Sequence, residues 1–137
     1  MWWIYALLSA LFAALTAIFA KVGIKGVDTD LATAIRTVVI LIIAWGIAFF
    51  RGGAATLHTL TKQNIIFLCL SGVATGLSWI FYFKALQLGK VSQVAPVDKM
   101  SVALAIIFSI IFLGETLTLK MAIGALLIIA GTIVLIL

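Results

Sequence analysis

The sequence predicts an all-α integral membrane protein with five transmembrane helices. Of its 137 residues, 66% are hydrophobic and 9% are charged, whereas a soluble domain is about half apolar and about a quarter charged. So few charges could not cover the surface of a water-soluble fold, and the hydrocarbon of a bilayer is the solvent that fits. The same composition excludes an intrinsically disordered chain. The apolar residues fall into five runs close to the roughly 20 residues that a helix needs to cross the hydrocarbon.

The first two spans are bounded by basic residues and a polar loop. The first is predicted over residues 2–21. It lacks the basic amino-terminal region and the cleavage site of a secretion signal, so we interpret it as a membrane helix. Thr29 or Asp30 is expected to be the N-cap of the second span. This span is predicted over residues 31–51 and is closed by Arg51 and a glycine pair.

The third span follows a polar connection and is predicted over residues 64–86. Gly89 is expected to end it in the left-handed conformation, which glycine adopts without a steric cost. Lys90 is expected to complement the negative end of the helix dipole.

The fourth span is unusual because it contains a proline. It is predicted over residues 93–114, with Pro96 close to its start. Proline is tolerated there if Ser92 is the N-cap, because the N–H groups of the first turn have no partner within the helix. The fifth span is predicted over residues 119–137. The spans together predict one membrane domain over residues 1–137, with very little outside the bilayer.

Polar residues within the third span fall on one helical face. That face is formed by Ser71, Thr75, Ser78 and Tyr82, spaced four, three and four residues apart, with Trp79 beside it. The hydroxyl groups could serve helix packing, bonding back to their own helix. Alternatively, the face lines a cavity in which Trp79 and Tyr82 offer flat surfaces to an apolar or cationic solute.

Three charged residues fall inside the spans. Arg36 lies about six residues into the second span, and Asp98 and Lys99 lie at a similar depth in the fourth. A charge in hydrocarbon costs several kcal/mol, so such residues are candidates for solute binding or proton coupling. An Arg36–Asp98 pair is geometrically possible, but adjacent positions point about 100° apart, so Asp98 and Lys99 are not expected to face one spot. The alternative is that Arg36 and Lys99 snorkel and that a helix N-terminus stabilises Asp98.

Other functions find little support in the sequence. The net charge is +5, but the basic residues are scattered singly, so nucleic-acid binding is not expected. His58 and Cys69 are each the only residue of their type. No disulfide framework, metal site or nucleophile–histidine–acid arrangement is therefore expected. We predict no enzyme activity, no metal and no cofactor.

Four motifs occur in order in the second half of the chain. The third span ends in KAL (84–86), the fourth contains APVDK (95–99) and ends in FLGE (112–115), and the fifth contains GALLIIAG (124–131). In this order and spacing, the sequence resembles an EamA domain of the drug/metabolite transporter superfamily, of the single-copy, five-span bacterial/archaeal transporter type. Lys21, Gly23 and Arg36 are compatible with the first half of that domain.

The resemblance implies half of a ten-helix inverted-repeat transporter. In most members, two five-span copies in one chain insert in opposite orientations and enclose a central cavity. This chain has one copy, so we expect a homodimer, with an antiparallel arrangement as the hypothesis. Gly124 and Gly131 are predicted to form the close-packed dimer contact. The number of Lys and Arg residues that flank the spans differs by about one between the two membrane faces, too small a bias to fix a single topology. One face has Lys21, Lys25, Lys84 and Lys90, and the other has Arg51, Lys62 and Lys120.

We therefore expect a multi-pass protein of the inner (plasma) membrane that acts as an exporter-like secondary transporter of a small organic metabolite or drug by alternating access. Its partners would be the solute, the lipid bilayer and a second copy. Asp98 is also the candidate for proton coupling. A lipid-linked sugar flippase is one alternative, and a non-transporting membrane subunit whose polar residues only pack helices is another. The predicted substrate-binding residues are Arg36, Ser78, Trp79, Tyr82, Asp98 and Lys99.

Overall fold

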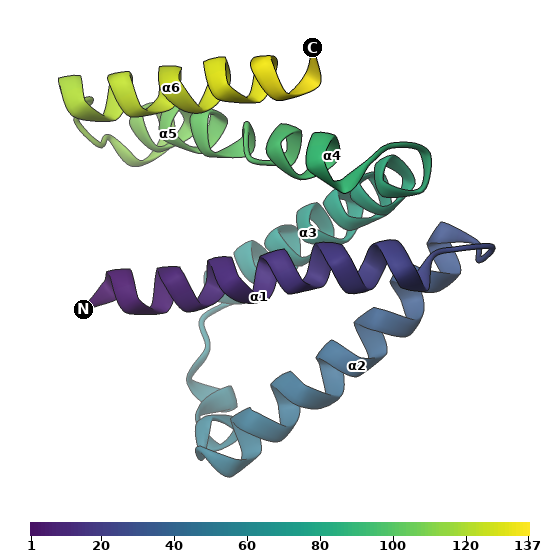
Figure 1. Cartoon of the computed structure of the whole chain (residues 1–137). Helices are drawn as coiled ribbons and strands as arrows, with labels where there is room; N and C mark the ends of the chain where they lie inside the picture. Colours follow the sequence, from purple (N-terminus) through teal and green to yellow (C-terminus); the bar gives the residue numbers. More distant parts are fainter. The chain divides into compact units, whose positions relative to one another are not determined.

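A computed structural model describes residues 1–137, which form helices and contain no strand. Five segments are long and apolar enough to cross a membrane, the fourth being Val91–Leu113. The predicted all-α membrane fold with five long apolar helices is thereby confirmed. The helices are α1 (Trp2–Gly23), α2 (Thr29–Phe50), the 3₁₀ helix η1 (Gly53–Thr59), α3 (Lys62–Leu88), α4 (Val91–Asp98), α5 (Ser101–Leu113) and α6 (Leu119–Ile136) (Figure 1).

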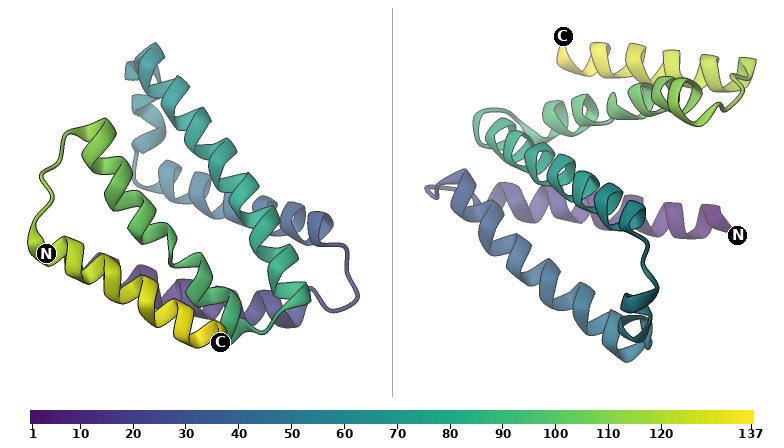
Figure 2. Two further views of the ribbon diagram at one scale, coloured as in Figure 1. Left: turned by 90° about the horizontal axis from the view of Figure 1, so that it is seen from above. Right: turned by 180° about the vertical axis from the view of Figure 1, so that it is seen from behind.

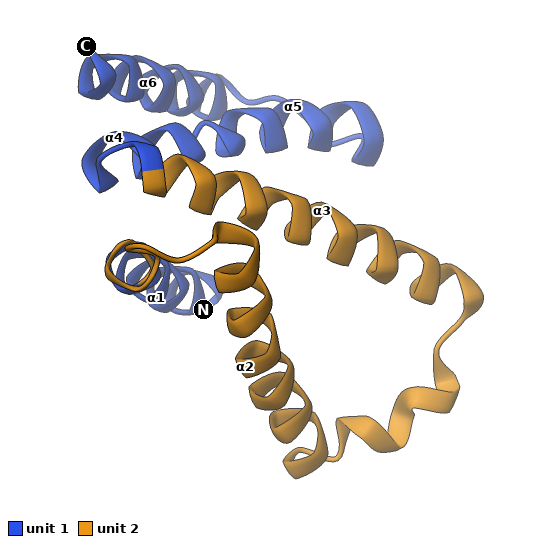
Figure 3. Ribbon diagram, turned by 90° about the vertical axis from the view of Figure 1, so that its right-hand side faces the viewer, with its two compact units in different colours: residues 1–19, 88–137 blue, residues 20–87 orange.

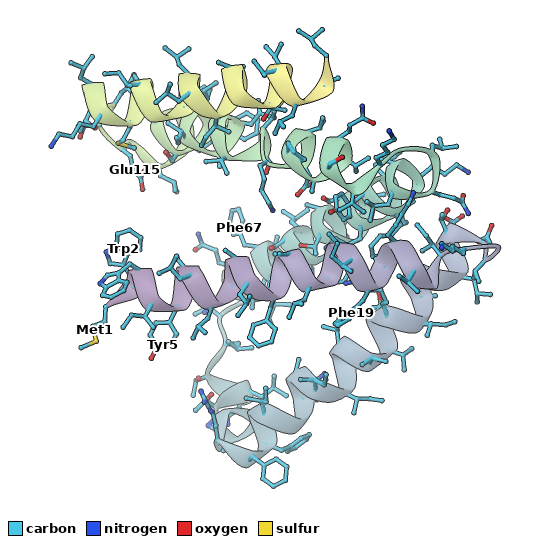
Figure 4. The ribbon with its side chains drawn as sticks, in the orientation of Figure 1. Met1, Trp2, Tyr5, Phe19, Phe67 and Glu115 are labelled. Carbon is cyan, nitrogen blue, oxygen red and sulfur yellow. The ribbon has the colours of Figure 1, made fainter.

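The chain divides into two units, each described by itself. Unit 1 contains residues 1–19 and 88–137, and unit 2 contains residues 20–87 (Figure 3). Large apolar side chains project outward along the helices, as Trp2, Phe19 and Phe67 illustrate (Figure 4). Such exposure suits a bilayer, because hydrocarbon solvates these side chains and water does not.

Unit 2 is built on α2 and α3. Asp28, in extended conformation, is the N-cap of α2, and its Oδ1 accepts hydrogen bonds from the backbone N–H groups of Asp30 at 2.9 Å and Leu31 at 3.0 Å. The prediction of Thr29 or Asp30 as the cap is therefore wrong. The helix begins as soon as a carboxylate can reach its second and third N–H groups, and Asp28 is the first residue able to do so.

The end of α3 also differs from the prediction. Gly89 is not left-handed, since the glycines with positive φ are Gly26, Gly52 and Gly114. Instead, the Lys21 ammonium group donates to the carbonyl oxygen of Leu86. A side chain from the end of α1 thus supplies a hydrogen bond to the last turn of α3, the role that the sequence assigned to a glycine turn.

Unit 1 contains a helical hairpin. α6 runs alongside α4 and α5, as the contacts between these helices and the views in Figure 2 agree. α5 ends at Leu113 with Gly114 as its left-handed C-cap, φ 68°, and the N–H of Glu115 donates to the carbonyl of Ser109 at 3.3 Å. Thr118 is the N-cap of α6, accepting from the N–H of Met121 at 3.2 Å.

The fourth span is two helices, and Ser92 is not its N-cap. Lys90 is the N-cap, so Pro96 is the sixth residue of α4 and lies beyond the first turn. Proline at this position has no N–H to donate to the carbonyl four residues earlier, which weakens the helix. α4 ends at Asp98, and α5 begins only at Ser101. The predicted tolerance of Pro96 as a first-turn residue is therefore wrong.

Candidate functional site

Arg36 lies on α2 and contacts two aromatic rings of α3. Its guanidinium carbon is 5.0 Å from the centre of the Trp79 ring and 4.3 Å from that of Phe83. Trp79 and Phe83 are four residues apart and therefore share one face of α3. Each such cation–π contact contributes about 0.5 to 1 kcal/mol when exposed and about 2 kcal/mol when desolvated.

Small hydroxyl residues form the surroundings of Arg36 on α2. Thr29 and Thr33 are buried, and the Thr33 hydroxyl donates to the carbonyl of Thr29 at 2.8 Å. Thr37 bonds in the same way to the carbonyl of Thr33 at 2.8 Å. The spacing of Thr29, Thr33 and Arg36 places them on one side of the helix. This side of α2 is polar and includes Arg36.

Two side chains connect the end of α3 with the chain that precedes α2. Lys21, at the end of α1, donates to the Leu86 carbonyl, and the amide of Gln87 donates to the carbonyl of Val27, in the loop before α2, at 3.0 Å. Phe83 and Leu86 are completely buried in this region. These contacts hold the ends of the two helices in register and so place Arg36 opposite Trp79 and Phe83.

Sequence reasoning named Arg36, Trp79 and Tyr82 but missed Phe83, Lys21 and Gln87. The position of Phe83 could have been found, because it follows Trp79 by one turn. The Tyr82 ring lies 6.0 Å from that of Phe83. The predicted hydroxyl face is otherwise outward: Ser71, Thr75 and Ser78 are exposed. The Thr75 hydroxyl bonds back to the Ser71 carbonyl at 2.9 Å.

In unit 1, Asp98 and Lys99 lie where α4 gives way to α5. The Lys99 ammonium group donates to Oδ2 of Asp98 at 3.3 Å, forming an ion pair. The long lysine side chain reaches back to the neighbouring carboxylate, a pair that the sequence did not predict. Asp98 is the last residue of α4, so stabilisation by that helix's N-terminus is also wrong.

The backbone at this junction is tightened. The N–H groups of Lys99, Met100 and Ala103 donate to carbonyls three residues earlier, at 3.1, 3.0 and 3.0 Å. Such 3₁₀ bonding inside a longer helix often marks a hinge. The buried Thr132 of α6 supports the junction: its hydroxyl is 3.2 Å from the carbonyl of Pro96 and 2.8 Å from that of Ile128.

The junction lies about a third of the way along its span. Lys99 is the ninth residue of the 23-residue segment Val91–Leu113, so it lies about 12 Å along the axis from the start. A bilayer core is about 30 Å thick. Discontinuous helices near the bilayer midplane are where secondary transporters form their solute and ion sites.

The remaining predicted residues lie as follows. A Cβ atom added to Gly124 or Gly131 would meet nothing within 4 Å, so neither glycine is required by packing within the chain. Arg36 belongs to unit 2 and Asp98 to unit 1, and a pair between them stays a hypothesis. No group of three or more His, Cys, Asp or Glu residues is placed to hold a metal ion.

Five apolar spans, one of them discontinuous and charged at its break, define a multi-pass membrane protein. The match to the EamA-like transporter family extends over residues 1–137, and the chain belongs to that family. The resemblance inferred from the motifs is thereby confirmed.

Two relatives extend this assignment. The chain is 48% identical, over 134 residues, to an uncharacterized transporter in the cobO 3′ region of a Sinorhizobium species, covering 98% of this chain and 95% of that protein. It is 39% identical over 77 residues to the uncharacterized protein MJ1333.1 of Methanocaldococcus jannaschii, covering 56% of each. No solved structure matches the chain.

Proposed function

We propose that this membrane transporter is a secondary transporter of a small organic metabolite or drug, working by alternating access in the inner membrane. The observation that carries the proposal is the interruption of the fourth span at Asp98 and Lys99, inside the segment that is long and apolar enough to cross a membrane. Holding an ion pair in hydrocarbon costs free energy. Ionisable residues inside membrane spans therefore generally mark substrate or ion pathways. A tightened junction between two short helices also provides a point about which one half of the span could move.

We further propose that residues 1–137 act as one membrane domain and that two copies complete a ten-helix carrier. One chain supplies five spans, and transporters of this kind generally enclose their site between two related repeats. Opposite insertion of two identical chains would reproduce an inverted repeat. Gly124 and Gly131 would form the dimer contact, which is compatible with the open space around both.

Transport is tested with the purified protein in liposomes loaded with a defined mixture of amino acids, nucleosides and organic acids. We expect selective loss of one class of solute, measured by mass spectrometry of the liposome contents. The control liposomes lack protein, and an enzyme would instead change the solutes chemically. Equal retention of every solute with and without protein would contradict the proposal and favour a non-transporting subunit.

Orientation is tested separately. A tag at the carboxyl terminus is labelled with a membrane-impermeant reagent in intact cells and again after permeabilisation. The antiparallel dimer predicts about half of the tags accessible from each side. Uniform accessibility from one side would rule out the antiparallel arrangement while leaving transport by a parallel dimer open to the flux assay.

A further inference from the structure

We propose that Arg36 of unit 2 binds an anionic group, a carboxylate or a phosphate, of the transported solute or of a lipid headgroup. The inference rests on the proposed transport function and names the chemical class of the ligand. It comes from three features: the two aromatic rings that hold the guanidinium group, the free hydrogen-bonding edge of that group, and the absence of a neutralising carboxylate in unit 2.

The aromatic rings are occupied by the protein's own cation. The guanidinium group lies 5.0 Å from the Trp79 ring and 4.3 Å from the Phe83 ring. An aromatic surface attracts one cation at close range, and a cationic solute at the same rings would be repelled by Arg36. The aromatic face of α3, which alone could bind a hydrophobic cation, therefore favours an anion when Arg36 lies against it.

The guanidinium group keeps its hydrogen-bonding capacity. Within unit 2, Arg36 makes no ion pair and no side-chain hydrogen bond; it contacts the two rings and interacts electrostatically with Tyr82. A guanidinium group carries five N–H donors in a planar fork that matches a carboxylate or phosphate. Ring contacts orient this fork but satisfy none of the donors.

No carboxylate of unit 2 neutralises Arg36. The unit has six Lys or Arg residues and two acidic residues, Asp28 and Asp30. Oδ1 of Asp28 caps α2 by accepting two backbone hydrogen bonds. The ion pair of the chain is Lys99 with Asp98, in unit 1. Both acidic residues precede Arg36 by six or more positions, outside the spacing of three or four that pairs side chains on a helix.

The depth of Arg36 makes an unpaired charge expensive. It is the eighth residue of α2, about 10 Å along the axis from Thr29. At that depth no water is present to accept hydrogen bonds, so each N–H donor without a partner costs free energy. An anion that reaches Arg36 would satisfy the fork and neutralise the charge together, which gives the site selectivity for anions.

The test uses fluorescence of Trp79 in the full chain. Trp2, Trp3 and Trp45 are replaced by Phe, leaving Trp79 as the one indole, beside Arg36. The probes are phenyl phosphate and benzoate, with benzyltrimethylammonium as the cation of similar size. In an uncharged detergent we expect a saturable change in Trp79 emission with either anion and none with the cation. A saturable response to the cation alone would overturn the proposal.

Two variants and a control assign the response to Arg36. Arg36→Gln is expected to weaken anion binding by about tenfold or more, the loss typical of a hydrogen-bonded charge. Arg36→Lys is expected to fall between, because it keeps the charge and loses the fork. The control is Arg51→Gln at the other end of α2, with binding unchanged. An anion response of equal strength in Arg36→Gln would overturn the proposal. If that variant does not fold, the proposal is still tested by comparing the Trp79 responses to the anions and to the cation in the chain that keeps Arg36.

Vesicles distinguish the two sources of the anion. In phosphatidylcholine vesicles, a free solute anion should titrate as it does in detergent. If the ligand is a lipid headgroup, phosphatidylglycerol in the vesicle should change Trp79 emission by itself and compete with phenyl phosphate, and Arg36→Gln should abolish both effects. Binding is measured without transport. A failed titration with intact solute flux would therefore refute the anion site alone, whereas anion binding without flux would refute the transport proposal.

Discussion

Replacing Thr132 by Val tests whether α6 holds the break in the fourth span. Valine keeps the shape of the buried threonine and removes its hydroxyl, which lies 3.2 Å from the Pro96 carbonyl and 2.8 Å from the Ile128 carbonyl. The second bond is within α6, whereas the first links α6 to α4. The variant therefore removes the hydrogen bond between the two helices without leaving a cavity.

The expected loss of stability is modest. Hydrogen bonds between membrane helices contribute about 0.6 kcal/mol on average and about 1 to 2 kcal/mol in model peptides. The Pro96 carbonyl keeps the N–H of Lys99 at 3.1 Å, so it is not left unsatisfied, which would cost about 1 to 3 kcal/mol. We expect a fall of about 1 kcal/mol in the free energy of unfolding, which changes the folding equilibrium about fivefold.

The measurement is equilibrium unfolding in mixed micelles, followed by circular dichroism, together with hydrogen exchange at the amides of residues 99–103. We expect faster exchange at those amides in Thr132→Val because the junction opens more readily. The control is Thr37→Val, which loses only a bond to Thr33 in its own helix at 2.8 Å. Equal destabilisation by the two substitutions, with unchanged exchange at the junction, would refute the reasoning.

Three further substitutions test other features. Pro96→Ala restores an N–H inside α4 and should raise the melting temperature, since proline in a helix interior costs about 3 kcal/mol; solute flux should fall, and unchanged flux would show that the interruption is not used. Asp98→Asn removes the ion pair with Lys99 at 3.3 Å and leaves that ammonium group without its carboxylate, which should lower the melting temperature and abolish the pH dependence of uptake; a retained dependence would remove Asp98 from coupling. Gly114→Ala, at φ 68°, should destabilise the chain by about 1 kcal/mol in the same unfolding assay, whereas Gly72→Ala, in open space within α3, should not.

The five apolar helices were predictable because each run is long and bounded by charges or turn residues, and burial in hydrocarbon does not depend on partners. The residues at which these helices begin and end were less predictable. Asp28 and Thr29 both cap helices well, and which one does so depends on where the loop from α1 arrives. Similarly, Gly89 suits a left-handed turn, but Lys21, far away in sequence, supplies a bond at that end of α3.

The candidate site was predictable as a set of residues and less so as an arrangement. Intramembrane charge drew attention to Arg36, Asp98 and Lys99 from the sequence alone. Stacking of Arg36 on Phe83 was not foreseen, because a phenylalanine in a membrane helix has many neighbours to choose from. The junction after Asp98 was not foreseen, because the sequence pattern predicts one span over residues 93–114 although Pro96 and the charged Asp98 and Lys99 interrupt its apolar run.

The division into units sets an order for biosynthesis. Unit 2 is one continuous stretch of chain, whereas unit 1 combines residues 1–19 with residues 88–137. At typical translation rates, roughly 3 to 14 seconds separate the synthesis of the two parts of unit 1. During that interval, α2 and α3 can join while the first helix lacks the helices with which it forms its unit. A chain stalled after α3 would therefore present the amino-terminal helix to membrane quality control without the rest of its unit, although the missing segment is at its carboxyl end.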